Sequence, residues 1–261
     1  MMQIHAEREE NPVKTIAFFN AKGGVGSTML AGCTAIFAMH DGVDVVGASL
    51  DARRDLRRWM IHQGIPWIDA TTDLPRPGLK YEDLIVLDIQ AGARCTDIIR
   101  PDLWVVPMDN RTAYENAVRL APTRHGPELW VWNNTHLDEG ELADSVPIYC
   151  RTVPEHLAAR VQFAPQVLYR DAAIANAADD FSMPRGGGPA RALHEFVRDV
   201  LIRVGHASHQ VLLTGEPSLH GRRCRPSNSP CETPADISAY LHTYARRELA
   251  ARERLQAFFA A

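Results

Sequence analysis

Lysine is rare in this chain of 261 residues, which has three lysines among its 28 basic residues. A long hydrophobic run is absent as well. No stretch is apolar for long enough to cross a bilayer, and the acidic opening MMQIHAEREENP has no apolar signal-peptide core. We therefore expect a cytoplasmic protein without membrane contact. The net charge of −4 predicts no general attraction to nucleic acid, so DNA binding would need a local basic patch.

Paired cysteines are missing too. The five cysteines are scattered without a C-x-x-C pair, at Cys33, Cys95, Cys150, Cys224 and Cys231. An odd number of scattered cysteines favours reduced thiols over a disulfide framework and predicts no structural zinc site. The histidines likewise lack the spacing of metal ligands.

The sequence does contain short apolar runs that alternate with segments of helical pattern. The predicted strands cover 13–19, 43–50, 84–89, 103–108, 129–134 and 146–150, and the predicted helices include 27–40, 53–63, 112–121 and 189–204. This alternation predicts an α/β fold with a doubly wound, mostly parallel sheet and helices on both faces. Sites in such sheets lie beyond the carboxyl ends of the strands, where Asn20, Asp51, Asp88 and Asn133 are expected.

The composition divides the chain into four parts. We expect an N-terminal tail over 1–12, one folded domain over 13–205, a linker or strap over 206–234 and a C-terminal accessory helix over 235–261. The accessory helix carries Phe258 and Phe259 after an arginine-rich stretch. We expect it to pack on the domain or to self-associate, with an anionic membrane surface or a partner groove as the alternatives.

A glycine-rich loop, NAKGGVGSTML over 20–30, lies between the first predicted strand and the first predicted helix. The general phosphate loop is G-x-x-x-x-G-K-[ST]. In residues 21–28, Ala21 replaces the first glycine, Gly26 is retained, Ser27 replaces the lysine and Thr28 retains the metal-binding hydroxyl. The pattern predicts a backbone cradle for phosphate without its usual charge. A glycine turn that merely joins a strand to a helix is the alternative.

The segment KGGVGST resembles the deviant Walker A loop, KGGxGK[ST], of the ParA and MinD superfamily of P-loop ATPases, and Lys22 matches its signature lysine. The resemblance covers most of 13–205. Asp51, in SLDARR, matches the residue that orients the attacking water, and Asn133, in WNN, matches the asparagine that reads adenine. In DIQAG, Asp88 matches the aspartate near Mg²⁺ and Gly92 matches the glycine whose N–H faces the γ-phosphate.

The resemblance implies a P-loop NTPase-like fold with ATP and Mg²⁺ as cofactors. Implied catalytic residues are Lys22 and Asp51, and implied metal ligands are Thr28 and Asp88. Implied nucleotide contacts are Lys22, Gly23, Gly24, Val25, Gly26, Ser27, Thr28, Gly92 and Asn133. It also implies an ATP-dependent homodimer in which Lys22 reaches the partner's nucleotide.

The departures from the family pattern leave two functions open. Ser27 stands at the Walker lysine, as a small residue does in the CpaE and TadZ kind of pilus localisation protein, and Ser49 stands at the first aspartate of the family's D-x-D motif. The first function is a ParA-like ATPase that positions or partitions DNA with an adaptor or centromere-binding protein. It would bind DNA non-specifically and associate with the nucleoid. The second is a non-hydrolysing ParA-like module that recruits a conjugation or pilus-assembly complex. Hydrolysis itself is left open.

Overall fold

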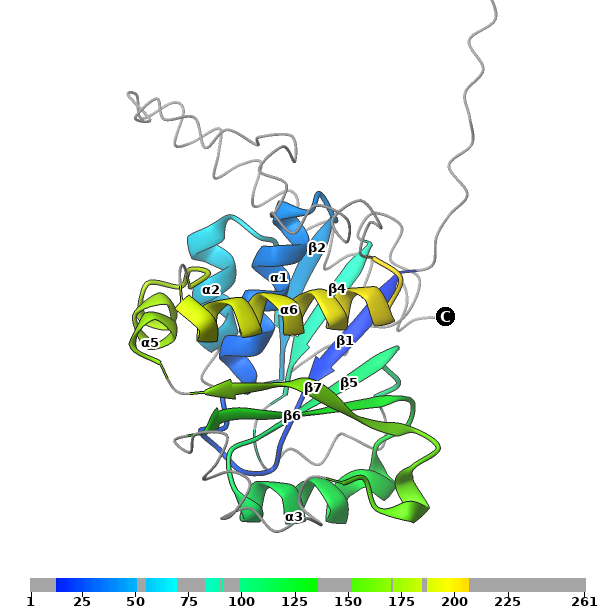
Figure 1. Cartoon of the computed structure of the whole chain (residues 1–261). Coiled ribbons are helices and arrows are strands. Elements are labelled where there is room, and N and C mark those ends of the chain that lie inside the picture. The colour runs from blue at the N-terminus through cyan, green and yellow to red at the C-terminus, as the bar shows by residue number, and fades with distance from the viewer. Residues whose placement is uncertain are drawn as a thin grey trace, which may run out of the picture.

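The computed structural model describes residues 13–50, 55–69, 83–89, 91, 99–135, 152–169, 171–184 and 187–206. Within these residues, seven strands form one sheet in the order β3-β2-β4-β1-β5-β6-β7 (Figure 1). The strands are β1 Lys14–Phe18, β2 Val45–Ser49, β3 Trp67–Asp69, β4 Leu84–Asp88, β5 Leu103–Met108, β6 Glu128–Thr135 and β7 Val161–Tyr169. Every pair is parallel, and β1 lies between β4 and β5. The carboxyl ends of all seven strands therefore lie on one edge.

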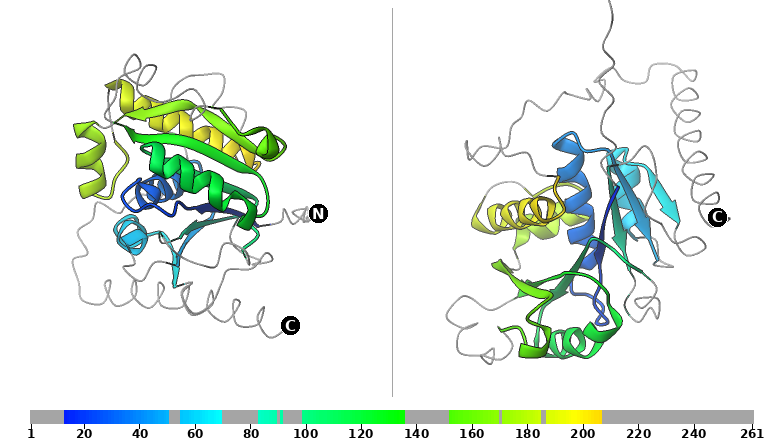
Figure 2. Two further views of the ribbon diagram at one scale, coloured as in Figure 1. Left: turned by 90° about the horizontal axis from the view of Figure 1, so that it is seen from below. Right: turned by 90° about the vertical axis from the view of Figure 1, so that its right-hand side faces the viewer.

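Helices cover both faces of this sheet. The described helices are α1 Ser27–His40, α2 Asp55–Gln63, α3 Arg111–Leu120, α5 Ala172–Asp179 and α6 Gly187–Arg203, with short 3₁₀ turns at Ala121–Thr123 and Glu155–Leu157. One core cluster joins α1, α2 and α6 to one face of the strands, and a second joins α3 to the opposite face. Figure 2 shows α1 and α6 on the same side of the sheet. The predicted doubly wound α/β fold is confirmed.

The helices approach the sheet closely because two glycines leave room for large side chains. A Cβ atom on Gly32 of α1 would lie 2.4 Å from the ring of Trp59, and one on Gly47 of β2 would lie 2.4 Å from Met60. Real Cβ atoms do not approach other atoms so closely, so alanine at either position would push α2 outward. These contacts fix α2 against α1 and β2.

A buried ion pair supports the connection between α3 and β6. Arg124 and Glu128 are both fully buried, and Nη2 of Arg124 lies 2.6 Å from Oε2 of Glu128. The indole N–H of Trp130 donates to the same carboxylate oxygen at 2.8 Å. Nη2 of Arg160, the residue just before β7, lies 3.4 Å from Oε1 of Glu128. Desolvation lowers the pKa of Arg124, and the Glu128 charge opposes that shift. Replacing only one residue of such a pair strongly lowers the stability of the fold, because the other charge stays buried without a partner.

The sequence missed three of the described elements. Strand β3 has three residues, too few for a pattern of alternation. Strand β7 contains Pro165, which argues against a central strand. Among the described strands, however, β7 lies at the edge of the sheet and pairs with β6 alone, so a missing N–H is tolerated. Helix α5, with sequence AAIANAAD, is short.

Some predicted segments lie outside the described residues. They are the strand over 146–150, the tail over 1–12 and the chain from 207 onward, which includes the predicted accessory helix. In the described part of the chain, no helix combines the length and the apolar character that crossing a membrane would require.

Candidate functional site

The glycine loop leaves β1 at the carboxyl edge of the sheet and leads directly into α1. Gly24 and Gly26 have φ angles of 82° and 85°, a left-handed conformation that residues with a Cβ atom rarely adopt. Within the part of the chain that the structure describes, a Cβ atom on Gly23 or Gly24 would meet nothing within 4 Å, so none of these residues fills the space beside the two glycines. The residue before α1 is Gly26, which has no side chain to cap the helix, so the N–H groups of the first turn are suited to interact with an anion.

Asn20 fixes the start of the loop. Its Nδ2 donates to the carbonyl of Pro107 at 2.8 Å and to that of Ala113 at 3.2 Å, and its Oδ1 accepts from the Lys22 N–H at 2.9 Å. Strand β1 ends at Phe18, so the Asn20 side chain continues the contact with β5 where backbone pairing has ended. The loop is thus tied both to β5 and to the start of α3.

Thr28 and Asp88 form the predicted metal-binding pair. The Thr28 hydroxyl donates to Oδ2 of Asp88 at 2.7 Å. Asp88 is the last residue of β4, is 2% exposed, and lies in register between Phe18 of β1 and Ser49 of β2. A hydroxyl and a carboxylate are hard oxygen donors, the kind that Mg²⁺ binds together with phosphate oxygens. The residues present therefore fit a magnesium nucleotide at this edge.

Lys22 lies against an acid of its own chain. Its Nζ is 2.6 Å from Oδ2 of Asp109, and the two side chains are 28% and 17% exposed. Asp109 directly follows β5, so the pair spans the gap between the loop and the neighbouring strand end. Sequence reasoning missed Asp109, although its position after the apolar run LWVVPM is the same signal that identified Asp88.

Asn133 contacts the loop from β6. Its Nδ2 donates to the carbonyl oxygen of Val25 at 2.6 Å, and Asn133 is only 1% exposed. A Cβ atom on Gly26 would lie 2.3 Å from the same nitrogen. Asp88 of β4, Asp109 after β5 and Asn133 of β6 therefore meet around one loop. Asp88 and Asn133 were predicted as site residues, and Asp109 was not.

Solved structures with a similar arrangement were found by comparison of folds. A protein assigned to plasmid partition from Borrelia burgdorferi B31, bound to AMPPNP, matches with a TM-score of 0.50 and 12% identity over 73% of this chain and 99% of that chain. Apo McdA from Cyanthece matches with a TM-score of 0.50 and 11% identity over 72% of this chain and 99% of that chain. The chain shares the α/β P-loop NTPase-like fold of these two structures.

No family model matches the sequence, and no curated protein matches it either. At identities of 11 to 12%, the likeness establishes the fold alone. The role of each residue at the loop therefore rests on the geometry of this chain.

Two predicted site residues, Asp51 and Gly92, lie outside the described residues, so their roles stay predictions. Ser27 is the first residue of α1 and is partly buried. Ser49, beside Asp88, is fully buried and brings a hydroxyl where the family has a carboxylate.

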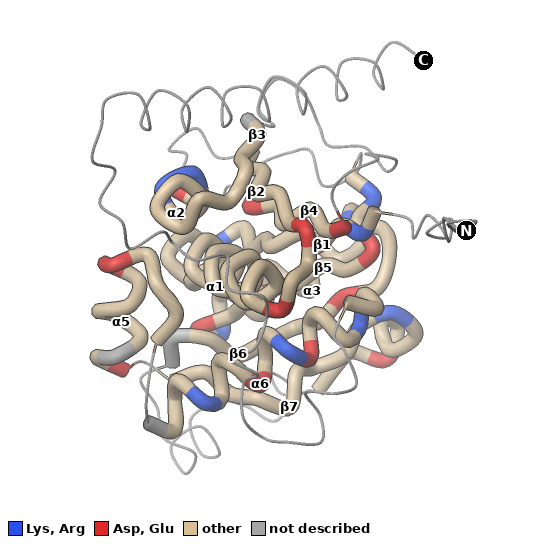
Figure 3. Tube along the Cα trace, turned by 90° about the horizontal axis from the view of Figure 1, so that it is seen from above, with Lys and Arg blue, Asp and Glu red and all other residues tan. Residues whose placement is uncertain are grey.

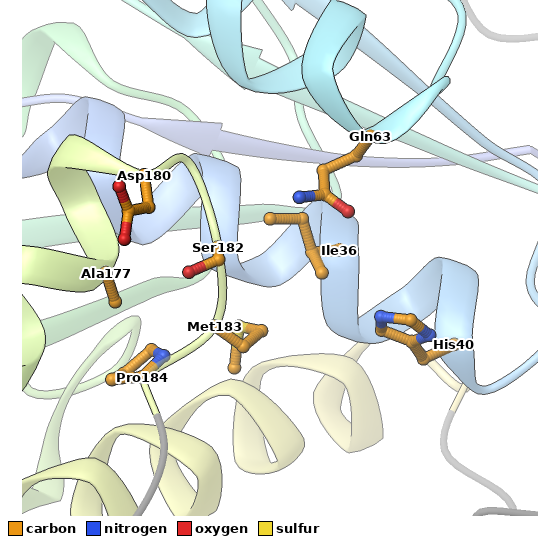
Figure 4. A pocket seen from close by; sticks show the side chains of 8 residues that line it. All are labelled: Ile36, His40, Gln63, Ala177, Asp180, Ser182, Met183 and Pro184. Atoms are coloured by element: carbon orange, nitrogen blue, oxygen red, sulfur yellow. The ribbon is translucent and has the colours of Figure 1, made fainter. Parts of the chain in front are cut away.

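The described residues also line an open pocket of about 490 Å³. It is lined by Ile36 and His40 of α1, Gln63 of α2, and Asp180 and Met183 of the segment between α5 and α6 (Figure 4). His40 ends α1, whereas the glycine loop begins it. The pocket is therefore at the opposite end of the helix from the loop. The described residues contain no group of three or more His, Cys, Asp or Glu side chains able to hold a metal ion.

The charges on α6 bear on the predicted DNA contact. Arg191 pairs with Glu195 at 2.9 Å and Arg203 pairs with Asp199 at 3.1 Å, each four residues apart. Figure 3 shows basic and acidic positions interspersed along the described helices. Helix α6 therefore presents mixed charge, and non-specific DNA binding stays a prediction that needs cations elsewhere in the chain.

Proposed function

We propose that the chain is a ParA-like, nucleotide-dependent homodimer that positions or partitions DNA and binds Mg-ATP at the glycine loop. The observation that carries the proposal is the open loop with the Thr28 hydroxyl held 2.7 Å from the Asp88 carboxylate, at the carboxyl edge of a parallel sheet. The Borrelia burgdorferi protein of the same fold is bound to AMPPNP, which supports a nucleotide as the ligand.

The binding chemistry follows from the residues of the loop. Backbone N–H groups of 23–28 would contact the phosphates, and Thr28 with Asp88 would hold Mg²⁺, which neutralises phosphate charge when bound. Ser27 would donate a neutral hydrogen bond to phosphate where the family has an ammonium group. A hydrogen bond to a charged group contributes about 1.5–3 kcal/mol, so we expect ATP affinity roughly tenfold to a hundredfold below that of a lysine-bearing loop.

Dimerisation would depend on Lys22. In the proposed ATP-bound dimer, this lysine contacts the nucleotide of the other protomer. It must therefore leave Asp109 of its own chain, from which its ammonium group is 2.6 Å away. ATP would supply the negative charge that competes with Asp109 for the ammonium group. We further propose that 13–205 forms the nucleotide-binding domain, that the protein works in the cytoplasm or on the nucleoid, and that an adaptor or centromere-binding protein directs it.

The alternative is a non-hydrolysing ParA-like module that recruits a conjugation or pilus-assembly complex. Two observations favour it: Ser27 removes a cation from the loop, and the buried Ser49 places no carboxylate beside Asp88. Phosphoryl transfer depends on cations placed where charge develops, so both changes bear more on hydrolysis than on binding. Under the first proposal, Asp51 orients water and Lys22 supplies the cation.

Calorimetric titration with Mg-ATP tests the proposed function. The unsubstituted protein should bind weakly, and Ser27→Lys should tighten binding tenfold to a hundredfold. Absence of binding by both proteins would refute a nucleotide site. Turnover of Mg-ATP, with and without DNA, then separates the two candidates: turnover that Asp51→Ala abolishes supports the ATPase, and binding without turnover supports the recruiting module.

A further inference from the structure

Asn133 has a second role that its match to an adenine-reading asparagine does not cover. We propose that Asn133 is a positioning residue, whose side-chain amide holds the Val25–Gly26 peptide so that the N–H of Gly26 faces the phosphates. The inference rests on the proposed function, because it assigns the task of this residue at the same nucleotide site.

The geometry of one peptide bond carries the argument. Nδ2 of Asn133 donates to the carbonyl oxygen of Val25 at 2.6 Å. In a planar trans peptide, the carbonyl of one residue and the N–H of the next point in opposite directions. Because the Val25 carbonyl is directed toward Asn133, the Gly26 N–H is directed away from it. Asn133 thereby sets the direction of a donor that the phosphate cradle needs.

Gly26 shows that this arrangement is tightly fitted. Its φ of 85° is left-handed, and a Cβ atom would lie 2.3 Å from Nδ2 of Asn133. A glycine without such a contact rotates freely between conformations, and a flipped Val25–Gly26 peptide would aim a carbonyl at the phosphate instead. Val25 and Asn133 are each 1% exposed, so water does not replace the bond easily.

The substitution at Ser27 makes this alignment more important. A loop with the Walker lysine has an ammonium group for the phosphates, whereas this loop depends on its backbone donors. The burial of Asn133 also leaves little of its side chain to contact a base. We therefore expect Asn133 to affect the affinity for the triphosphate group, independently of the base attached to it.

Binding of Mg-ATP and of Mg-tripolyphosphate, which has no base, tests the inference. Asn133→Asp keeps the shape but turns a donor into an acceptor facing the Val25 carbonyl, so both ligands should bind roughly tenfold more weakly. Gly26→Ala places a methyl group against the Asn133 amide. It should therefore weaken the binding of both ligands as well. Thr34→Ala, which removes a buried hydroxyl bonded to Leu30 in the middle of α1, is the control for general destabilisation and should change neither affinity.

A second readout is independent of any ligand. Hydrogen exchange of the loop amides in the free protein should be faster in Asn133→Asp than in Thr34→Ala, because only the former loosens the Val25–Gly26 peptide. Loss of ATP affinity with tripolyphosphate affinity unchanged would identify Asn133 as a base reader and overturn the inference, as would unchanged loop exchange. If the unsubstituted protein binds neither ligand, the proposed function fails, and the exchange result still decides whether Asn133 positions the loop.

Discussion

Replacing Asp109 with asparagine should strengthen the ATP-dependent dimer. In the proposed dimer, Lys22 of each protomer leaves Asp109 to reach the partner's nucleotide, so each protomer loses one ion pair of 2.6 Å. The side chains are 28% and 17% exposed, which places the pair at the upper end of the range for partly solvated ion pairs, about 1 kcal/mol. Two pairs per dimer then cost about 2 kcal/mol, which corresponds to roughly thirtyfold in the dimer dissociation constant.

Sedimentation equilibrium in Mg-AMPPNP measures this constant directly. The chain offers a matched control in Lys14 and Asp102, a second Lys–Asp pair at 3.0 Å that lies at the opposite edge of the sheet, where β1 and β5 begin. Asp102→Asn should leave the dimer constant unchanged. Combining Asp109→Asn with Lys22→Ala should remove the gain, because no lysine remains to be released.

An unchanged dimer constant in Asp109→Asn would refute the reasoning. It would mean that Lys22 stays on its own chain in the dimer, or that the dimer does not involve the nucleotide. A gain of the same size in Asp102→Asn would also refute it, since the effect would then come from net charge alone.

Further predictions concern the metal site, the buried ion pair and pH. Thr28→Ala should weaken ATP binding in calorimetry chiefly when Mg²⁺ is present, because the hydroxyl beside Asp88 is the proposed ligand. Glu128→Gln should lower the free energy of unfolding in urea by about 3–5 kcal/mol, because it leaves Arg124 charged and buried without its partner; a loss below 1 kcal/mol would contradict this. Burial lowers the pKa of His206, so the unfolded chain binds a proton more readily than the fold does, and stability should decrease as pH falls below about 6.5. His206→Gln should flatten that decrease in urea titrations at pH 7 and pH 5, and an equal slope in both proteins would exclude His206 as its source.

The sequence could predict the sheet and the proximity of Thr28 to Asp88 because both leave local signals. Apolar runs of strand length marked β1, β2, β4, β5 and β6, and the loop leads into α1 with the predicted boundaries, Ser27–His40. Since the carboxyl ends of parallel strands share one edge, Asp88 at the end of β4 was expected near Thr28, and the hydrogen bond between them confirms that proximity.

The partners of Lys22 and Asn133 could not be predicted in the same way. Which strand end lies beside the loop depends on the strand order, and the apolar runs do not encode that β1 has β5 on one side and β4 on the other. The contact between Asn133 and Val25 also requires the left-handed glycines to bring the loop carbonyl toward β6. A motif names the residues of a site, but the direction of each side chain is fixed by tertiary packing.

The contacts that shape the loop have a consequence for synthesis on the ribosome. The loop is made early, yet Asp88, Asp109 and Asn133 follow the loop residues they contact by 60, 87 and 108 positions. At translation rates of about 5–20 residues per second, the segment up to Asn133 appears roughly 5 to 20 seconds after Val25. The acids are made within that interval and the amide at its end, so until then the nascent chain has the glycines without the complete set of side chains that contact the loop. Under the proposed function, nucleotide would therefore not assist the early steps of folding, and a chain truncated before β6 should not be retained by immobilised ATP even though it carries the whole motif.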